Sequence, residues 1–126
     1  MTMSRPNKCI LIVDDDAAIR QTLSELLEEE GYLVASVANG REALDYLRDD
    51  PSSISLVLLD LMMPVMDGFQ FRAEQKRDPM LASMPIVVMT ARGGTDRAGI
   101  DADAVISKPF DVLKLMDTIE RSCRRE

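Results

Sequence analysis

Four apolar runs in this sequence end at residues whose side chains could take part in phosphoryl chemistry. These residues are Asp14, Asp15, Asp60, Thr90 and Lys108. Asp15 and Asp60 are suited to hold Mg²⁺, which prefers octahedral oxygen coordination with one or two carboxylates and several waters. A carboxylate could also attack phosphorus, a lysine could offset phosphate charge, and a hydroxyl could donate a hydrogen bond to the phosphoryl group. Each residue alone could be a helix cap or a turn residue, but the set predicts Mg²⁺-dependent phosphoryl chemistry.

The segment Ser55 to Gly68, SLVLLDLMMPVMDG, is the one around which we expect the chain to be organised. Leu56 to Leu59 has the composition of a strand buried on both faces, and it ends at Asp60. Ligands of α/β sheets bind at the carboxyl ends of the strands, so a carboxylate there lies in a crevice. The alternative is that Asp60 only caps the turn that follows.

The run Cys9 to Val13 ends in the same way, at three consecutive aspartates, Asp14 to Asp16. Three adjacent carboxylates repel one another. The group could be a solvated acidic loop, or it could hold a divalent cation that offsets the repulsion.

The elements that must position these side chains follow from the apolar pattern. The expected strands are Cys9 to Val13, Tyr32 to Val37, Leu56 to Leu59, Ile86 to Met89 and Ala104 to Ser107. Apolar residues at helical spacing predict three helices before the last one. The first extends from Asp16 to Gly31, the second follows Asn39-Gly40, and the third runs from Gly68 to about Arg77 with few apolar residues. The last helix begins at Asp111, with Val112, Leu115, Met116, Ile119 and Cys123 facing inward.

Strands that alternate with helices predict an α/β fold, a parallel sheet covered on both faces by right-handed crossovers. The segment Ala91 to Ile100 is the weakest part of this pattern, because it contains three glycines. Each glycine costs a helix about 1 kcal/mol relative to alanine, so we expect a shortened or irregular fourth helix there.

Composition limits the function classes. A chain of 126 residues fits one domain, with residues 1–7 as a tail and 8–126 as the domain. The net charge of −7, without a basic block, argues against direct nucleic-acid binding. No apolar run reaches the roughly 20 residues of a membrane span, and the N-terminus lacks a signal-peptide core, so we expect no membrane insertion and a cytoplasmic location. Cys9 and Cys123 fit free thiols, with a disulfide as the alternative.

Four motifs together resemble the receiver domains of two-component response regulators, of the chemotaxis-regulator type. They are IVDDD, LLDLMMPVMDG, VVMTA and SKPF, and the resemblance extends from about Lys8 to Cys123. It implies a flavodoxin-like receiver fold, a five-stranded parallel sheet of order 2-1-3-4-5.

The resemblance also implies roles for individual residues. Asp60 would be the phosphoacceptor, Asp15 the main Mg²⁺ ligand and Asp14 its partner. The backbone carbonyl of Met62 would be a further ligand. Thr90 would be the switch hydroxyl, and Lys108 would pair with the acyl phosphate.

Two departures from the family pattern are visible. The position where receivers commonly carry an aromatic switch residue corresponds to Val105, which has no ring. Thr90 and Lys108 lie 18 positions apart, about one helical turn fewer than is typical, and the missing residues fall in the glycine-rich stretch. No sequence resembling an effector domain is present, so we expect a stand-alone receiver or a domain of a larger protein.

Three functions compete. The first is a phosphorylation-dependent switch that catalyses its own phosphorylation and dephosphorylation. It would accept its phosphoryl group from a sensor histidine kinase or a histidine phosphotransfer protein and signal to a downstream protein partner. The second is a degenerate receiver that binds proteins without phosphate. The third, an Mg²⁺-dependent phosphohydrolase, is disfavoured because a second acid is missing two positions after Asp60, where Met62 stands.

Overall fold

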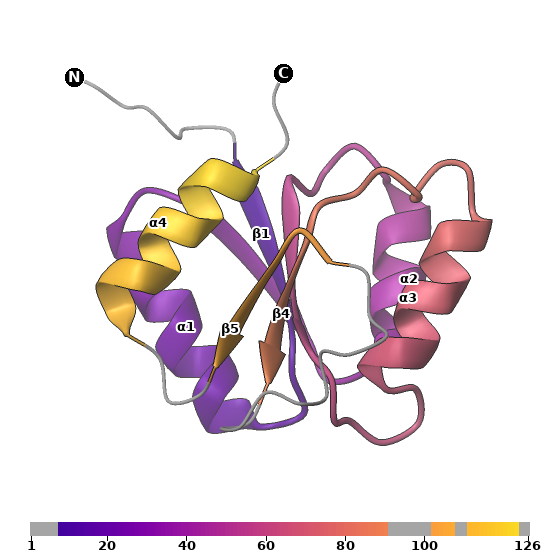
Figure 1. Ribbon diagram of the computed structural model, residues 1–126, viewed down its shortest axis with the longest axis horizontal. Helices are drawn as coiled ribbons and strands as arrows, with labels where there is room; N and C mark the ends of the chain where they lie inside the picture. Colours follow the sequence, from indigo (N-terminus) through magenta and orange to yellow (C-terminus); the bar gives the residue numbers. More distant parts are fainter. Residues whose placement is uncertain (1–7, 91–101, 108–110, 124–126) are drawn as a thin grey trace.

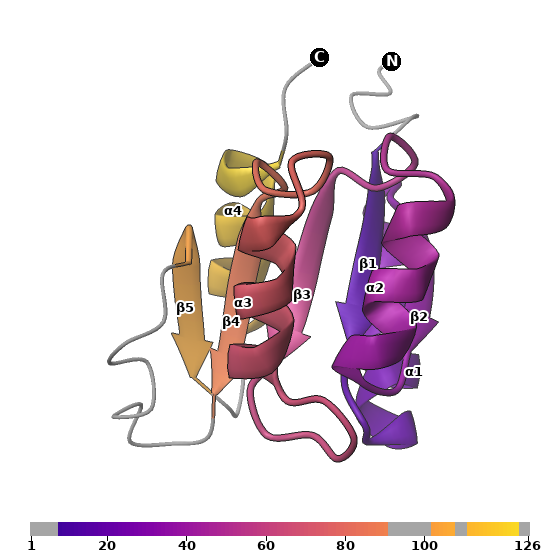
Figure 2. The same cartoon turned by 90° about the vertical axis from the view of Figure 1, so that its right-hand side faces the viewer.

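The computed structural model describes residues 8–90, 102–107 and 111–123. Within them lies one five-stranded parallel sheet of order β2-β1-β3-β4-β5, as predicted (Figure 2). Its strands are β1 (Cys9–Val13), β2 (Leu33–Val37), β3 (Leu56–Asp60), β4 (Ile86–Thr90) and β5 (Ala104–Ser107). The helices are α1 (Ala17–Glu29), α2 (Gly40–Asp49), α3 (Gly68–Arg77) and α4 (Val112–Ser122). The part of the chain that the structure describes contains no helix long and apolar enough to cross a membrane.

The helices form one layer on each face of the sheet. Helices α1 and α4 cover one face, and α2 and α3 cover the other (Figure 1). This arrangement explains why the central strands are apolar at nearly every position, since both of their faces are buried. In β3 all five residues are buried, and the same holds for β4.

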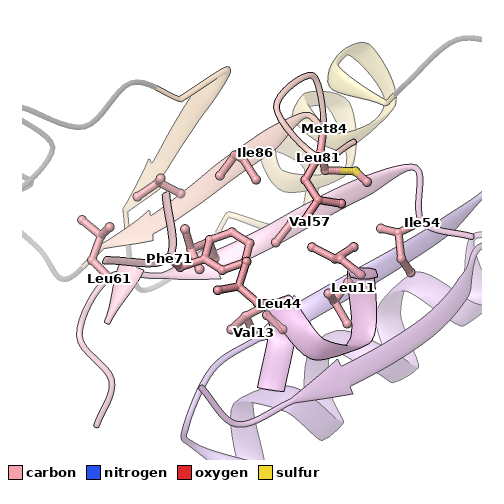
Figure 3. Close-up of a cluster of buried hydrophobic side chains, with 14 residues drawn as sticks. Leu11, Val13, Leu44, Ile54, Val57, Leu61, Phe71, Leu81, Met84 and Ile86 are labelled. Atoms are coloured by element: carbon pink, nitrogen blue, oxygen red, sulfur yellow. The ribbon is translucent and has the colours of Figure 1, made fainter. Parts of the chain in front are cut away.

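Alternate residues of the central strands divide the core into two clusters. Toward α2 and α3, residues such as Leu11, Val57 and Val88 pack with Leu44 and Phe71 (Figure 3).

Toward α1 and α4, the intervening strand residues pack with apolar residues of those two helices. This cluster includes Ile12, Leu58 and Met89 from the strands, with Leu23 from α1 and Ile119 from α4. This packing fixes each helix on its face of the sheet, and it thereby fixes the two ends of each loop that joins a strand to a helix.

Each of the four helices in the described residues begins at an N-cap side chain that accepts backbone hydrogen bonds. The caps are Asp16, Asn39, Asp67 and Asp111. Asp67 completes a capping box with Gln70, an arrangement of a type worth about 1 kcal/mol. The predicted stop after α1 is present too, with Gly31 at φ 97°.

Several expectations need correction or fall outside the described residues. Val112 does not face inward: it is 44% exposed, because it is the first residue of α4 and lies beyond both clusters. The second strand begins at Leu33, one residue later than expected. Cys9 and Cys123 are separate thiols, so the disulfide alternative is not formed. The tail 1–7 and the doubtful fourth helix at 91–100 lie outside the described residues.

Helix α3 has few apolar residues for a specific reason. Gln75, at a position where a leucine would be expected, is fully buried. Its Nε2 donates hydrogen bonds to the carbonyl oxygens of Leu81, at 2.7 Å, and Met84, at 3.1 Å. The glutamine thus satisfies two carbonyls of the segment that leads from α3 to β4, and an apolar residue could not do so.

Candidate functional site

The sheet topology brings the carboxylates of two strands together. The strand order reverses between β1 and β3, and in open α/β sheets the ligand crevice lies beyond the carboxyl ends of the strands at such a point. Asp14 and Asp15 directly follow β1, and Asp60 ends β3. One oxygen from each of these three carboxylates lies within 4.8 Å of the others. The third aspartate of the run, Asp16, caps α1 instead.

Asp14 is held from several sides. Its carboxylate is fully buried and accepts a hydrogen bond from the Asp16 N–H at 2.9 Å. Its own N–H donates to the Val37 carbonyl at 3.2 Å, which continues the pairing of β1 with β2. The Arg20 Nη1 donates to the Asp14 carbonyl oxygen at 2.6 Å. These bonds fix the direction in which the chain leaves β1, with Asp14 buried and Asp15 exposed to solvent.

The loop after Asp60 packs closely against the end of β3. Asp60 is only 6% exposed, and its Oδ1 accepts a hydrogen bond from the Met62 N–H at 3.4 Å. The loop closes where the Gly68 N–H donates to the Leu61 carbonyl at 3.0 Å. A Cβ on Gly68 would lie 2.8 Å from the Leu61 Cα and 2.9 Å from the Asp60 carbonyl oxygen, so only glycine fits there.

The donor set fits Mg²⁺. Ligands of one Mg²⁺ lie about 2.1 Å from it, so two of them are at most about 4.2 Å apart. Carboxylate oxygens already within 4.8 Å of one another need only small side-chain movements to reach that geometry. Two of the three carboxylates are buried, and their mutual repulsion favours a cation. Asp14, Asp15 and Asp60 could therefore hold the ion, with the Met62 carbonyl as a further oxygen.

Comparison with known proteins decides the family. The family model described as "Response regulator receiver domain" matches residues 10–120. The chain belongs to this family. The receiver fold expected from the sequence motifs is thus confirmed.

Relatives of this receiver domain are response regulators. It is 41% identical over 122 residues to "Response regulator Rre1" of Synechocystis sp., covering 93% of this chain and 52% of that protein. It is 39% identical over 120 residues to the "Transcriptional regulatory protein CpxR homolog" of Haemophilus influenzae, covering 92% of this chain and 50% of that protein. The chain therefore spans about half the length of the curated relatives that it matches.

Solved structures of similar proteins have the same fold as this chain. The chemotaxis protein CheY4 of Vibrio cholerae superposes with a TM-score of 0.81 at 30% identity, covering 91% of this chain and 98% of that one. The signal receiver domain of a histidine kinase from Syntrophus aciditrophicus gives a TM-score of 0.82 at 31% identity, covering 90% and 88% of the two chains.

The remaining predicted site residues differ in how far they are described. Thr90 ends β4 and is 2% exposed; it follows Met89, the residue paired with Asp60, so it lies at the same sheet edge. Lys108 lies outside the described residues, directly after the end of β5 at Ser107. Val105 is half-buried and packs against the cluster under α2 and α3. It has no ring to move in or out.

Sequence reasoning missed one residue that shapes the site of this receiver domain. Arg20 lies in the first turns of α1, and its bond to the Asp14 carbonyl places a positive charge beside the acidic group. A signal was present in the sequence, because an arginine one helical turn after the cap Asp16 can reach back to the strand end.

Proposed function

We propose that this receiver domain is a phosphorylation-dependent switch in which Asp60 accepts a phosphoryl group. The observation that supports this proposal most is the convergence of the Asp14, Asp15 and Asp60 carboxylates within 4.8 Å at the end of two parallel strands. A buried nucleophilic carboxylate beside a divalent-cation site is the arrangement that phosphoryl transfer to an aspartate requires.

In the proposed reaction a carboxylate oxygen of Asp60 forms a bond to phosphorus while the N–P bond of a donor phosphohistidine breaks. The electron pair of that bond stays on the imidazole nitrogen, which takes up a proton from solvent. Asp14, Asp15, Asp60 and the Met62 carbonyl would hold Mg²⁺, which would supply positive charge to the phosphoryl oxygens. Acetyl phosphate can replace phosphohistidine because the donor only has to present a phosphoryl group with a good leaving group.

Two further residues act on the phosphorylated state. Lys108 pairs with a phosphoryl oxygen, and the Thr90 hydroxyl donates a hydrogen bond to another. Thr90 is the last residue before 91–101, so its movement toward the phosphoryl group would be passed to that segment. With valine at position 105, we propose that the switch operates without movement of an aromatic ring.

The partners follow from this chemistry. The phosphoryl donor is a sensor histidine kinase or a histidine phosphotransfer protein in the cytoplasm, and a downstream protein recognises the phosphorylated form. Nucleic acid is not expected to bind this domain directly, because its net charge is −7.

The test is incubation with acetyl phosphate, followed by intact-mass measurement. We expect one added phosphoryl group in the presence of Mg²⁺ and none with a chelator. Asp15→Ala should lose both the labelling and the rise in thermal midpoint that millimolar Mg²⁺ gives the wild type. Wild-type protein that stays unlabelled although Mg²⁺ stabilises it would contradict the proposal and favour phosphate-independent protein binding.

A further inference from the structure

The loop between β3 and α3 contains an unusual backbone conformation. Val65 has φ 68°, the one non-glycine residue with positive φ among those that the structure describes. A β-branched side chain is strongly disfavoured there, because its Cβ substituents crowd the adjacent carbonyl. The Val65 side chain is 78% exposed, so its own packing offers almost nothing to offset this strain.

Backbone hydrogen bonds impose the conformation. The Met66 N–H donates to the Pro64 carbonyl at 2.7 Å, which closes a three-residue γ-turn around Val65. The γ-turn with positive φ at its centre is the rare and strained form. The Met66 carbonyl in turn accepts a hydrogen bond at 2.9 Å from the N–H of Gly40, the first residue of α2.

The anchor on α2 leaves the loop little freedom. A Cβ on Gly40 would lie 2.8 Å from the Met66 carbonyl oxygen and 3.1 Å from the Phe71 Cβ. The loop is therefore clamped at Met66 by a helix that is distant in sequence, and at its end by the bond from Gly68 to Leu61. Because Val65 is strained between these two fixed points, the strain favours a second conformation of the loop in which the γ-turn is open.

The strained residue lies in the segment that carries a proposed metal ligand. Met62 is three positions before Val65, and its N–H already contacts Asp60. We propose that Val65 is a positioning residue that lowers the Mg²⁺ affinity of this receiver domain. The strain reduces the fraction of molecules in which the closed γ-turn holds the Met62 carbonyl in place, and the apparent dissociation constant rises in proportion. This inference rests on the proposed Mg²⁺ site.

Substitutions at position 65 separate strain from other effects. Glycine adopts positive φ freely and asparagine tolerates it, whereas isoleucine is β-branched like valine. Calorimetric titration with Mg²⁺ should give dissociation constants for Val65→Gly and Val65→Asn about threefold or more below the wild-type value. Val65→Ile, the matched control, should bind as the wild type does.

A second readout needs no metal. Amide hydrogen exchange at Gly40, whose N–H donates to the Met66 carbonyl, should slow in Mg²⁺-free Val65→Gly and Val65→Asn, because the exchange rate follows the fraction of molecules in which the turn is open. Equal dissociation constants in all four proteins, with unchanged exchange at Gly40, would overturn the inference. A wild type that shows no Mg²⁺ binding would instead overturn the proposed metal site, and with it the affinity claim, whatever the exchange rates are.

Discussion

Asp60→Asn should stabilise the metal-free protein, although it removes the proposed phosphoacceptor. Asp60 is 6% exposed, and its carboxylate shares the site with those of Asp14 and Asp15. Asparagine keeps an oxygen that can accept the hydrogen bond of the Met62 N–H, and it has nearly the same volume. The substitution therefore mainly removes one negative charge from a cluster of three.

The magnitude follows from the separation. At the 4.8 Å limit two unit charges repel by about 0.9 kcal/mol in bulk water and by about 3.5 kcal/mol at an effective dielectric constant near 20. Asp15 is exposed, so its repulsion is near the lower value, whereas buried Asp14 is nearer the higher one. The other contacts of Asp60 offset part of this repulsion. We expect a net gain of about 1–2 kcal/mol in the free energy of unfolding.

Urea denaturation with and without Mg²⁺ measures this gain. Without Mg²⁺ the midpoint for Asp60→Asn should rise by roughly 0.5–1 M. With Mg²⁺ the difference in midpoint between Asp60→Asn and the wild type should shrink or change sign, because the ion stabilises the wild type more than the variant. Asp45→Asn, at an exposed carboxylate that pairs with Arg41 at 3.8 Å, is the matched control and should change little in either buffer. A metal-free Asp60→Asn less stable than the wild type would refute the reasoning.

Three further predictions concern residues around the site and core. Gly68→Ala should lower the free energy of unfolding by about 1–3 kcal/mol and weaken Mg²⁺ binding, because its Cβ would press on backbone atoms of Asp60 and Leu61; urea denaturation and calorimetry check both effects. Gln75→Leu should cost about 2 kcal/mol in the same denaturation assay, since it removes the two buried hydrogen bonds that Gln75 donates to the Leu81 and Met84 carbonyls. An unchanged midpoint would contradict this. Burial raises the pKa of the Cys9 thiol above 9.0, so its alkylation should require higher pH in the folded than in the unfolded protein. Because the folded-state pKa is raised, the contribution of this thiol to the free energy of unfolding is complete below pH 9.0 and is lost as the pH rises through the folded-state pKa. Cys9→Ala should not show this loss of stability at high pH.

The strands and the acidic site were predictable because both leave local patterns. A parallel strand buried on two faces is a continuous apolar run, and its end is marked where a charge begins, as at Asp14 and Asp60. The topology then places these ends together without further information. Helix starts were equally predictable, because the side chain of a cap such as Asp16 or Asp111 accepts hydrogen bonds from backbone N–H groups only two or three residues later in the chain.

What the sequence did not indicate depends on contacts between distant segments. The burial of Gln75 depends on two carbonyls that come later in the chain, and the backbone of Val65 is set by a hydrogen bond network that begins at Gly40. Helical spacing predicted an inward Val112, but spacing alone does not show where the core ends along the helix axis. The bond from Arg20 to the Asp14 carbonyl also joins two elements, α1 and the end of β1, although the position of Arg20 one turn after the cap Asp16 already placed it within reach.

The central claim is that Asp60 carries the phosphoryl group, and reductive trapping tests it most directly. Borohydride reduces an aspartyl phosphate to homoserine, which peptide mass spectrometry locates in the chain. After phosphorylation with acetyl phosphate and Mg²⁺, we predict homoserine at position 60 of the wild type and at no position in Asp60→Asn. Homoserine at another aspartate of the wild type, or trapping undiminished in Asp60→Asn, would contradict the account.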